Sequence, residues 1–94
     1  MHNNPIGIFD SGVGGITILN SIKEIMPNED IIYFSDNFNS PYGEKSEKEI
    51  KNLSKKNSNW LLERGCKIIV VACNTATTNS ISFLRANLNV PFIG

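Results

Sequence analysis

Short apolar runs alternate with longer amphipathic stretches along this chain. The apolar runs have the length of strands and lie at positions 5–9, 31–34, 67–72 and 90–93. Between them, hydrophobic residues recur at helical spacing over about 18–26, 46–64 and 75–87. Strands that alternate with helices in this way predict an α/β fold. We expect a parallel sheet built from successive βα units, in three layers and with right-handed crossovers.

Local signals mark where the predicted elements begin and end. Pro27 closes the first helix. Ser46, followed three residues later by Glu49, has the form of a capping box, and Gly65 fits the left-handed position that ends a helix. The run at 67–72 is apolar almost throughout, which predicts a parallel strand covered on both faces.

Polar, small and reactive residues collect in the loops that follow the first three strands. These loops lie at 10–15, 36–45 and 73–78. Strand-to-helix loops of a parallel sheet leave at the carboxyl ends of the strands, where α/β proteins bind ligands. The sequence therefore predicts one ligand site at the point where these loops converge.

The first of these loops, Asp10–Gly15, is rich in glycine. It lacks the third glycine of the dinucleotide-binding fingerprint and the Lys-Ser/Thr pair of the P-loop. Its glycines would still let a ligand approach the backbone, and amides at a helix start favour an anion. A tight strand-to-helix turn, with Asp10 serving only as a cap, is the alternative.

Cys73 ends the third predicted strand and precedes the third helix. A helix N-terminus stabilises a thiolate at such a position, and Asn74 and Thr75 add donors that suit a carboxylate. A buried, inert cysteine is the alternative. Cys66 lies at the other end of the same strand, roughly 20 Å from Cys73 along an extended chain, and this distance excludes a disulfide between the two. We therefore interpret Cys66 only as an inert cysteine.

The composition narrows the possible partners. The 94 residues suit one small domain, and nine Lys and Arg balance nine Asp and Glu for a formal net charge of zero. This balance argues against nucleic acid and anionic membranes as partners. We expect no metal, because no His, Cys, Asp and Glu residues show ligand spacing. Without a membrane span or secretory leader, and with free thiols, the sequence predicts a cytoplasmic protein.

Three motifs together resemble the N-terminal half of bacterial glutamate racemases. They are the segments 5–15 (PIGIFDSGVGG), 41–43 (PYG) and 71–76 (VACNTA), and they occur in the order and at the spacing of that family. The resemblance extends over essentially all 94 residues. It implies one half of a two-domain, pseudo-symmetric α/β racemase with its active site between the domains.

The resemblance also implies an activity and a set of site residues. The family interconverts L-glutamate and D-glutamate without a cofactor and supplies D-glutamate for peptidoglycan. By this resemblance Cys73 is one of two catalytic thiols, and Asp10 contacts the substrate and assists Cys73. The remaining implied substrate-binding residues are Ser11, Tyr42, Gly43, Asn74 and Thr75.

Two departures from the family pattern limit these expectations. The loop at 35–40 (SDNFNS) differs from the usual Gly-Asp-Thr-Ala-Arg form, and the second cysteine of the family, which precedes Thr-His, is absent. We therefore expect residues 1–94 to be an incomplete N-terminal domain that is inactive alone. The resemblance also implies a homodimer for the full-length protein. A racemase for aspartate or another amino acid, and a non-catalytic anion-binding α/β module, are the alternatives.

Overall fold

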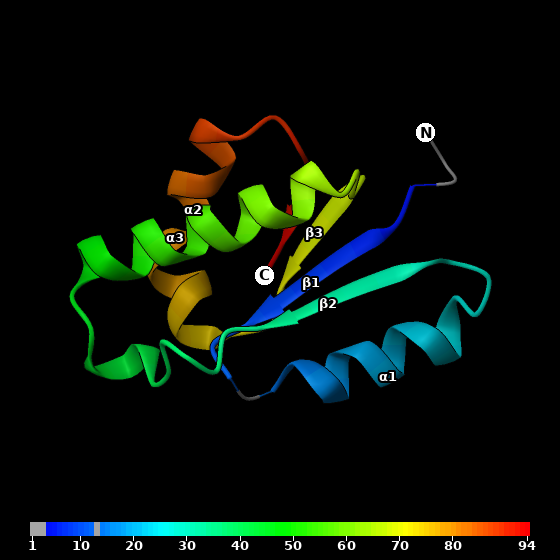
Figure 1. Ribbon diagram of the computed structural model, residues 1–94, viewed down its shortest axis with the longest axis horizontal. Coiled ribbons are helices and arrows are strands. Elements are labelled where there is room, and N and C mark those ends of the chain that lie inside the picture. Colours follow the sequence, from blue (N-terminus) through cyan, green and yellow to red (C-terminus); the bar gives the residue numbers. More distant parts are fainter. Residues whose placement is uncertain (1–3, 13) are drawn as a thin grey trace.

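The computed structural model describes residues 4–12 and 14–94, and its elements follow the order predicted from the sequence (Figure 1). Within these residues, the one addition is a short 3-10 helix, η1, in the polar loop after the second strand. The elements are β1 (Ile6–Asp10), α1 (Gly15–Ile25), β2 (Ile31–Ser35), η1 (Tyr42–Glu44), α2 (Glu47–Glu63), β3 (Ile68–Val71), α3 (Asn74–Asn87) and β4 (Phe92–Ile93).

The strands form one parallel sheet in the order β2-β1-β3-β4. Helix α1 lies on one face of this sheet, whereas α2 and α3 pack side by side on the other (Figure 1). The predicted three-layer α/β fold is therefore confirmed. Because the strands are parallel, the loops after β1, β2 and β3 all leave at the same end of the sheet.

The main hydrophobic core lies between the sheet and the α2–α3 layer. Phe9 and Ile69 from the central strands meet Leu61 and Leu84 from the helices, and all four side chains are fully buried. Each such burial contributes about 2 kcal/mol from removal of apolar surface from water. The buried members of this core are Phe9, Tyr42, Ile50, Leu61, Cys66, Ile69, Val71, Ala76, Leu84 and Phe92.

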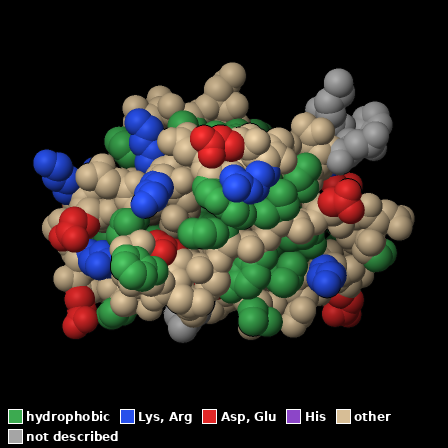
Figure 2. Space-filling model, in the orientation of Figure 1, with side chains coloured by type: hydrophobic (Ala, Val, Ile, Leu, Met, Phe, Trp, Pro, Cys, Tyr) green, Lys and Arg blue, Asp and Glu red, His purple; other side chains and the backbone are tan. Residues whose placement is uncertain are grey.

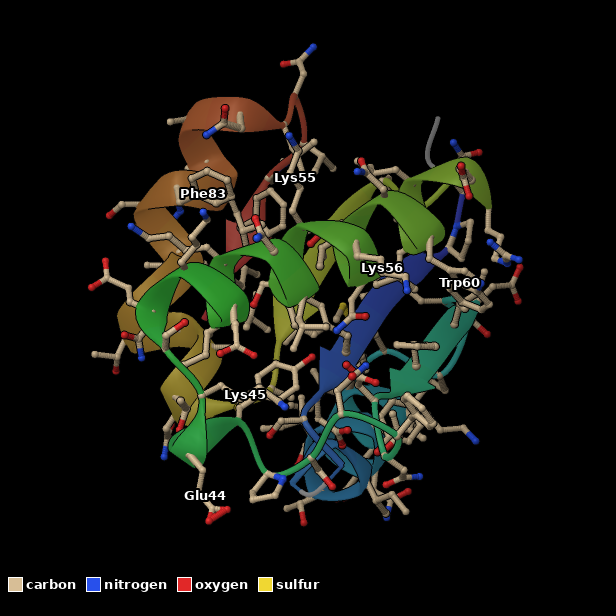
Figure 3. The ribbon with its side chains drawn as sticks, turned by 60° about the vertical axis from the view of Figure 1, so that its left-hand side comes forward. Glu44, Lys45, Lys55, Lys56, Trp60 and Phe83 are labelled. Carbon is tan, nitrogen blue, oxygen red and sulfur yellow. The ribbon has the colours of Figure 1, made fainter. Side chains whose placement is uncertain are left out.

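Aromatic side chains make contacts between α2 and its neighbours in the sheet and in α3. In Figure 3, Trp60 lies near the carboxyl end of α2, where its ring centroid is 5.1 Å from that of Phe34 in β2. Phe83 of α3 lies beside α2 in the same view, and the Lys51 nitrogen is 5.9 Å from its ring centroid. These contacts fix α2 against both the sheet and α3.

The face of the sheet that carries α1 is less well covered than the sequence predicts. In β3, Ile69 and Val71 are buried against α2 and α3, but Ile68 and Val70 are only half-buried on the opposite face. Helix α1 packs over β1 and β2, which leaves an apolar cleft of about 380 Å³ beside β3 and β4. The expectation that β3 is covered on both faces is therefore wrong for the α1 side.

The predicted ends of α2 are confirmed. The Ser46 hydroxyl accepts a hydrogen bond from the Glu49 amide at 3.2 Å, and the Glu49 carboxylate accepts one from the Ser46 amide at 3.5 Å. Gly65 follows the helix with φ of 83°, a conformation that residues with a side chain rarely adopt. These local signals act within one turn of the chain, which explains why the sequence alone reveals them.

Charged side chains of both signs are interspersed over the face shown in Figure 2. This distribution agrees with the balanced composition and offers no extended cationic surface on that face. Within residues 4–12 and 14–94, no helix has the length and apolar character needed to cross a membrane.

Candidate active site

The carboxylate of Asp10 is the centre of the turn between β1 and α1. It is fully buried and accepts hydrogen bonds from the amides of Gly12 and Gly15, each at 2.8 Å. The Ser35 hydroxyl donates to it at 2.7 Å, and the Tyr33 hydroxyl donates to it as well. A buried carboxylate is stable only with such partners, and Asp10 has four among the described residues.

The glycines of this turn are required by its own geometry. Gly12 and Gly14 have φ of 106° and 92°, in the left-handed region that favours glycine. A Cβ at Gly15 would lie 2.3 Å from the Asp10 carboxylate, which no packing allows. The tight turn capped by Asp10 thus accounts for the glycine-rich segment, and Asp10 already occupies the Gly12 and Gly15 amides that were expected to attract an anion.

Cys73 stands at the N-terminus of α3 with two polar contacts to its sulfur. The Ala76 amide donates to Sγ at 3.4 Å, and the Ser11 hydroxyl oxygen lies 3.0 Å from Sγ. The side chain is half-buried rather than enclosed in the core. The Cys73 sulfur therefore lies at a helix N-terminus, within hydrogen-bond distance of a hydroxyl, and is not enclosed in the core as a purely structural cysteine would be.

A cleft of about 470 Å³ opens beside the Cys73 sulfur. Ser11 and Gly14 contribute to its wall from the β1–α1 turn, and Asn74 and Thr75 contribute from the first turn of α3. Asn74 is exposed and Thr75 half-buried, so both are accessible to a ligand. The structure therefore brings four of the predicted site residues to one cleft: Ser11, Cys73, Asn74 and Thr75.

Tyr42 and Gly43 lie outside the lining of this cleft. Tyr42 is 1% exposed, and its hydroxyl donates to the Asp36 carboxylate at 2.5 Å and accepts from the Asn57 amide at 2.8 Å. Burial, followed by the hydrogen bond to Asp36, raises the pKa of Tyr42 far above its ordinary value. The Tyr42 side chain is thus occupied in anchoring its loop, while the adjacent Gly43 is exposed.

Two residues of β2, which the sequence pattern does not single out, also contact the site. Tyr33 and Ser35 reach Asp10 because β1 and β2 pair in parallel, with Asp10 opposite Ser35 and Ile8 opposite Tyr33. Alternate residues of a strand face the same side, so both hydroxyls point toward the Asp10 carboxylate. The strand register would have revealed them, but a single sequence does not contain that register.

Cys66 lies at the opposite end of β3 and is buried in the core. Burial raises the pKa of its thiol, and nearby Arg64 offsets part of this effect. Both cysteines are free. In the described part of the chain, no three His, Cys, Asp or Glu side chains are grouped as metal ligands would be.

The amino-acid sequence of the chain is similar to those of known proteins. No protein-family model matches the chain. All 94 residues align at 50% identity with a glutamate racemase from Herpetosiphon aurantiacus. Over its whole length, the chain is similar to glutamate racemases.

Solved structures of the glutamate racemase family share this fold. A glutamate racemase isoform from Bacillus anthracis superposes on the whole chain with a TM-score of 0.94 at 37% identity. The glutamate racemase from Francisella tularensis, solved in complex with D-glutamate, superposes on 98% of the chain with a TM-score of 0.90 at 39% identity.

The chain spans only part of the length of these family members. It covers 37% of the Herpetosiphon glutamate racemase and 35% of each of the two solved chains.

Proposed function

We propose that this chain supplies one half of a cofactor-independent site that interconverts L-glutamate and D-glutamate. The observation that carries this proposal is the position of Cys73, whose sulfur lies at a helix N-terminus, beside a cleft and within hydrogen-bond distance of Ser11. The curated relative that aligns with the whole chain is named glutamate racemase, and a glutamate racemase that superposes on 98% of the chain was solved in complex with D-glutamate.

The chemistry of racemisation fits a thiol in this environment. A Cys73 thiolate removes the α-proton and becomes a thiol, leaving the electron pair on the α-carbon. A second acid on the opposite face then delivers a proton to that carbon and inverts its configuration. Donors from Asn74 and Thr75 hold the substrate carboxylate and counter the negative charge that develops in the transition state.

The two residues at the base of the turn have different parts in this proposal. Ser11 lies against the Cys73 sulfur and lines the cleft, so it can contact both thiol and substrate. Asp10 is enclosed beneath the turn and assists Cys73 by holding that turn in place.

Gly43 offers its exposed main chain to the polar groups of the substrate, and Tyr42 keeps Gly43 in position.

A two-base mechanism needs a second acid that Cys66 does not supply. Cys66 is buried at the far end of β3, away from the cleft beside Cys73. The resemblance to glutamate racemases implies that the second thiol comes from a second domain outside residues 1–94, so the 94-residue chain alone does not racemise glutamate. The complete protein acts in the cytoplasm as a homodimer and supplies D-glutamate for peptidoglycan.

A glutamate-protection experiment tests this function. The 94-residue chain is alkylated with iodoacetamide with and without glutamate, and modification of each cysteine is followed by peptide mass spectrometry. We expect Cys73 to react faster than Cys66 and glutamate to slow Cys73 selectively. Aspartate serves as the control ligand, and stronger protection by aspartate would support a different amino-acid substrate. Equal, unprotected rates at both cysteines would favour a non-catalytic module.

A second experiment tests the half-site interpretation. The chain is incubated with L-glutamate in deuterated water, and α-hydrogen exchange and D-glutamate formation are measured together. We expect no D-glutamate above the level of a Cys73→Ser control. Sustained formation of D-glutamate by the unaltered chain would overturn the proposal that a second thiol is missing.

A further inference from the structure

Among the described residues, four donors surround Asp10, and they come from two separate segments of the chain. Gly12 and Gly15 belong to the turn that follows β1, but Tyr33 and Ser35 belong to the neighbouring strand β2. Burial, followed by the hydrogen bond to Asp10, raises the pKa of Tyr33, so its hydroxyl keeps its proton and remains a donor at neutral pH. Asp10 is thus clamped between β2 and the start of α1.

The contact between this clamp and the reactive cysteine passes through Ser11. Among the residues that the structure describes, Asp10 forms its hydrogen bonds with the turn and β2, and none of them goes to Cys73. Ser11, the next residue along the chain, has its hydroxyl oxygen 3.0 Å from the Cys73 sulfur. The direction of the Ser11 side chain depends on the turn that Asp10 holds closed.

We propose that Tyr33 and Ser35 are positioning residues of the Cys73 site. Their hydroxyls fix the Asp10 carboxylate on the Gly12 and Gly15 amides, and the fixed turn holds the Ser11 hydroxyl against the Cys73 sulfur. This inference rests on the proposed function, in which Cys73 reacts as a thiolate. A hydroxyl held in this position donates to the thiolate and stabilises it relative to the thiol.

The test is the pH profile of Cys73 alkylation in the 94-residue chain. Rates with iodoacetamide are measured from slightly acidic to alkaline pH for the unaltered chain and for Ser11→Ala, Tyr33→Phe and Ser35→Ala. We expect each substitution to move the midpoint of the profile to higher pH by about half a unit to one unit. At neutral pH this corresponds to alkylation about three to ten times slower.

Double variants separate a positioning role from a direct one. In the Ser11→Ala background, we expect Tyr33→Phe and Ser35→Ala to leave the midpoint unchanged, because the group through which they act has been removed. Ser35→Thr keeps a hydroxyl at this position, and we expect it to restore the unaltered profile. Additive shifts in the double variants would overturn the proposal, as would unaltered profiles in both single variants of β2.

Two internal controls exclude a merely structural effect. Ser46→Ala removes a hydroxyl from the capping box of α2, far along the chain from Asp10, and should destabilise the fold without moving the Cys73 midpoint. The alkylation rate of buried Cys66 reports loss of folding in every variant. If the β2 substitutions raised the rates of both cysteines together, the hydroxyls would only support the fold and the proposal would be wrong.

The alkylation profiles are measured without glutamate, so they do not depend on the identity of the substrate. Loss of glutamate protection at Cys73 would contradict the proposed function and leave the pH profiles unchanged. Additive or absent shifts would contradict the positioning role and leave glutamate protection unchanged. The two failures are therefore distinguishable.

Discussion

The hydroxyl oxygen of Ser11 lies 3.0 Å from the sulfur of Cys73, although 62 positions separate them in the chain. The parallel register of β1 and β3 explains this proximity, because it pairs Phe9 with Val71. Two residues further along each strand, the chain reaches Ser11 and Cys73. Both residues thus leave adjacent strands at the same level, so the sheet register brings the hydroxyl and the thiol together, and the turn that Asp10 holds directs the Ser11 side chain.

Replacement of Asp10 by asparagine should destabilise the fold. Asn keeps the shape of the side chain but loses the negative charge, and its amide group would face donors that now bind a carboxylate oxygen. We expect Asp10→Asn to lower the free energy of unfolding by about 3 kcal/mol, as measured by urea denaturation. Asp30→Asn, at an exposed position, is the matched control and should change it by less than about 0.5 kcal/mol.

Gly15 and Gly43 should respond very differently to alanine. A Cβ at Gly15 would lie 2.3 Å from the Asp10 carboxylate and 2.5 Å from the Tyr33 ring, whereas a Cβ at Gly43 has no neighbour within 4 Å. Thermal unfolding should therefore show that Gly15→Ala lowers the free energy of unfolding by about 3 kcal/mol or more. Gly43→Ala should lower it by less than about 1 kcal/mol. Equal losses would contradict the packing described around Asp10.

The stability of the chain should fall at alkaline pH. The pKa of Tyr42 is raised above its ordinary value of 10.0, so the folded state keeps the phenol protonated while the unfolded chain ionises. This contribution is fully present below pH 10 and is lost as the pH rises above it. The raised pKa of Cys66, ordinarily 9.0, extends the same loss down to about pH 9.

Urea denaturation across this pH range tests the contribution of Tyr42. We expect the free energy of unfolding to fall with a slope that approaches about 1.4 kcal/mol per pH unit for each such group. In Tyr42→Phe the slope above pH 10 should be smaller, because one titrating group is gone. Identical slopes in the two proteins would show that Tyr42 titrates alike in the folded and unfolded states.

Loss of the capping box should weaken α2 by a modest amount. Ser46→Ala removes the acceptor for the Glu49 amide, and we expect a loss of about 1 kcal/mol in the free energy of unfolding. Ser82→Ala, on an exposed turn of α3, is the matched control and should be neutral or slightly stabilising, since alanine has the higher helix propensity. A neutral Ser46→Ala would mean that the helix start is held by its packing alone.

The sequence by itself determined the order of the elements, the parallel sheet and the end of the sheet at which the site lies. These features follow from hydrophobic periodicity and from capping signals such as Ser46 and Gly65, which act within a few residues. It also selected Ser11, Cys73, Asn74 and Thr75, which line one cleft in the structure. These residues lie in the loops that follow the first and third predicted strands, so the parallel topology places them at one edge of the sheet, and the family resemblance singled out Ser11 within its loop.

Only the tertiary structure decided which side chains contact one another and which hydrogen bonds they form. The contacts of Asp10 with Tyr33 and Ser35 depend on the register of β1 against β2, and the hydrogen bond from Asn57 to the Tyr42 hydroxyl depends on where α2 packs. The open apolar cleft beside β3 depends on where α1 lies across the sheet. Register and packing arise from contacts between distant segments, and the periodicity of a single chain carries no record of them.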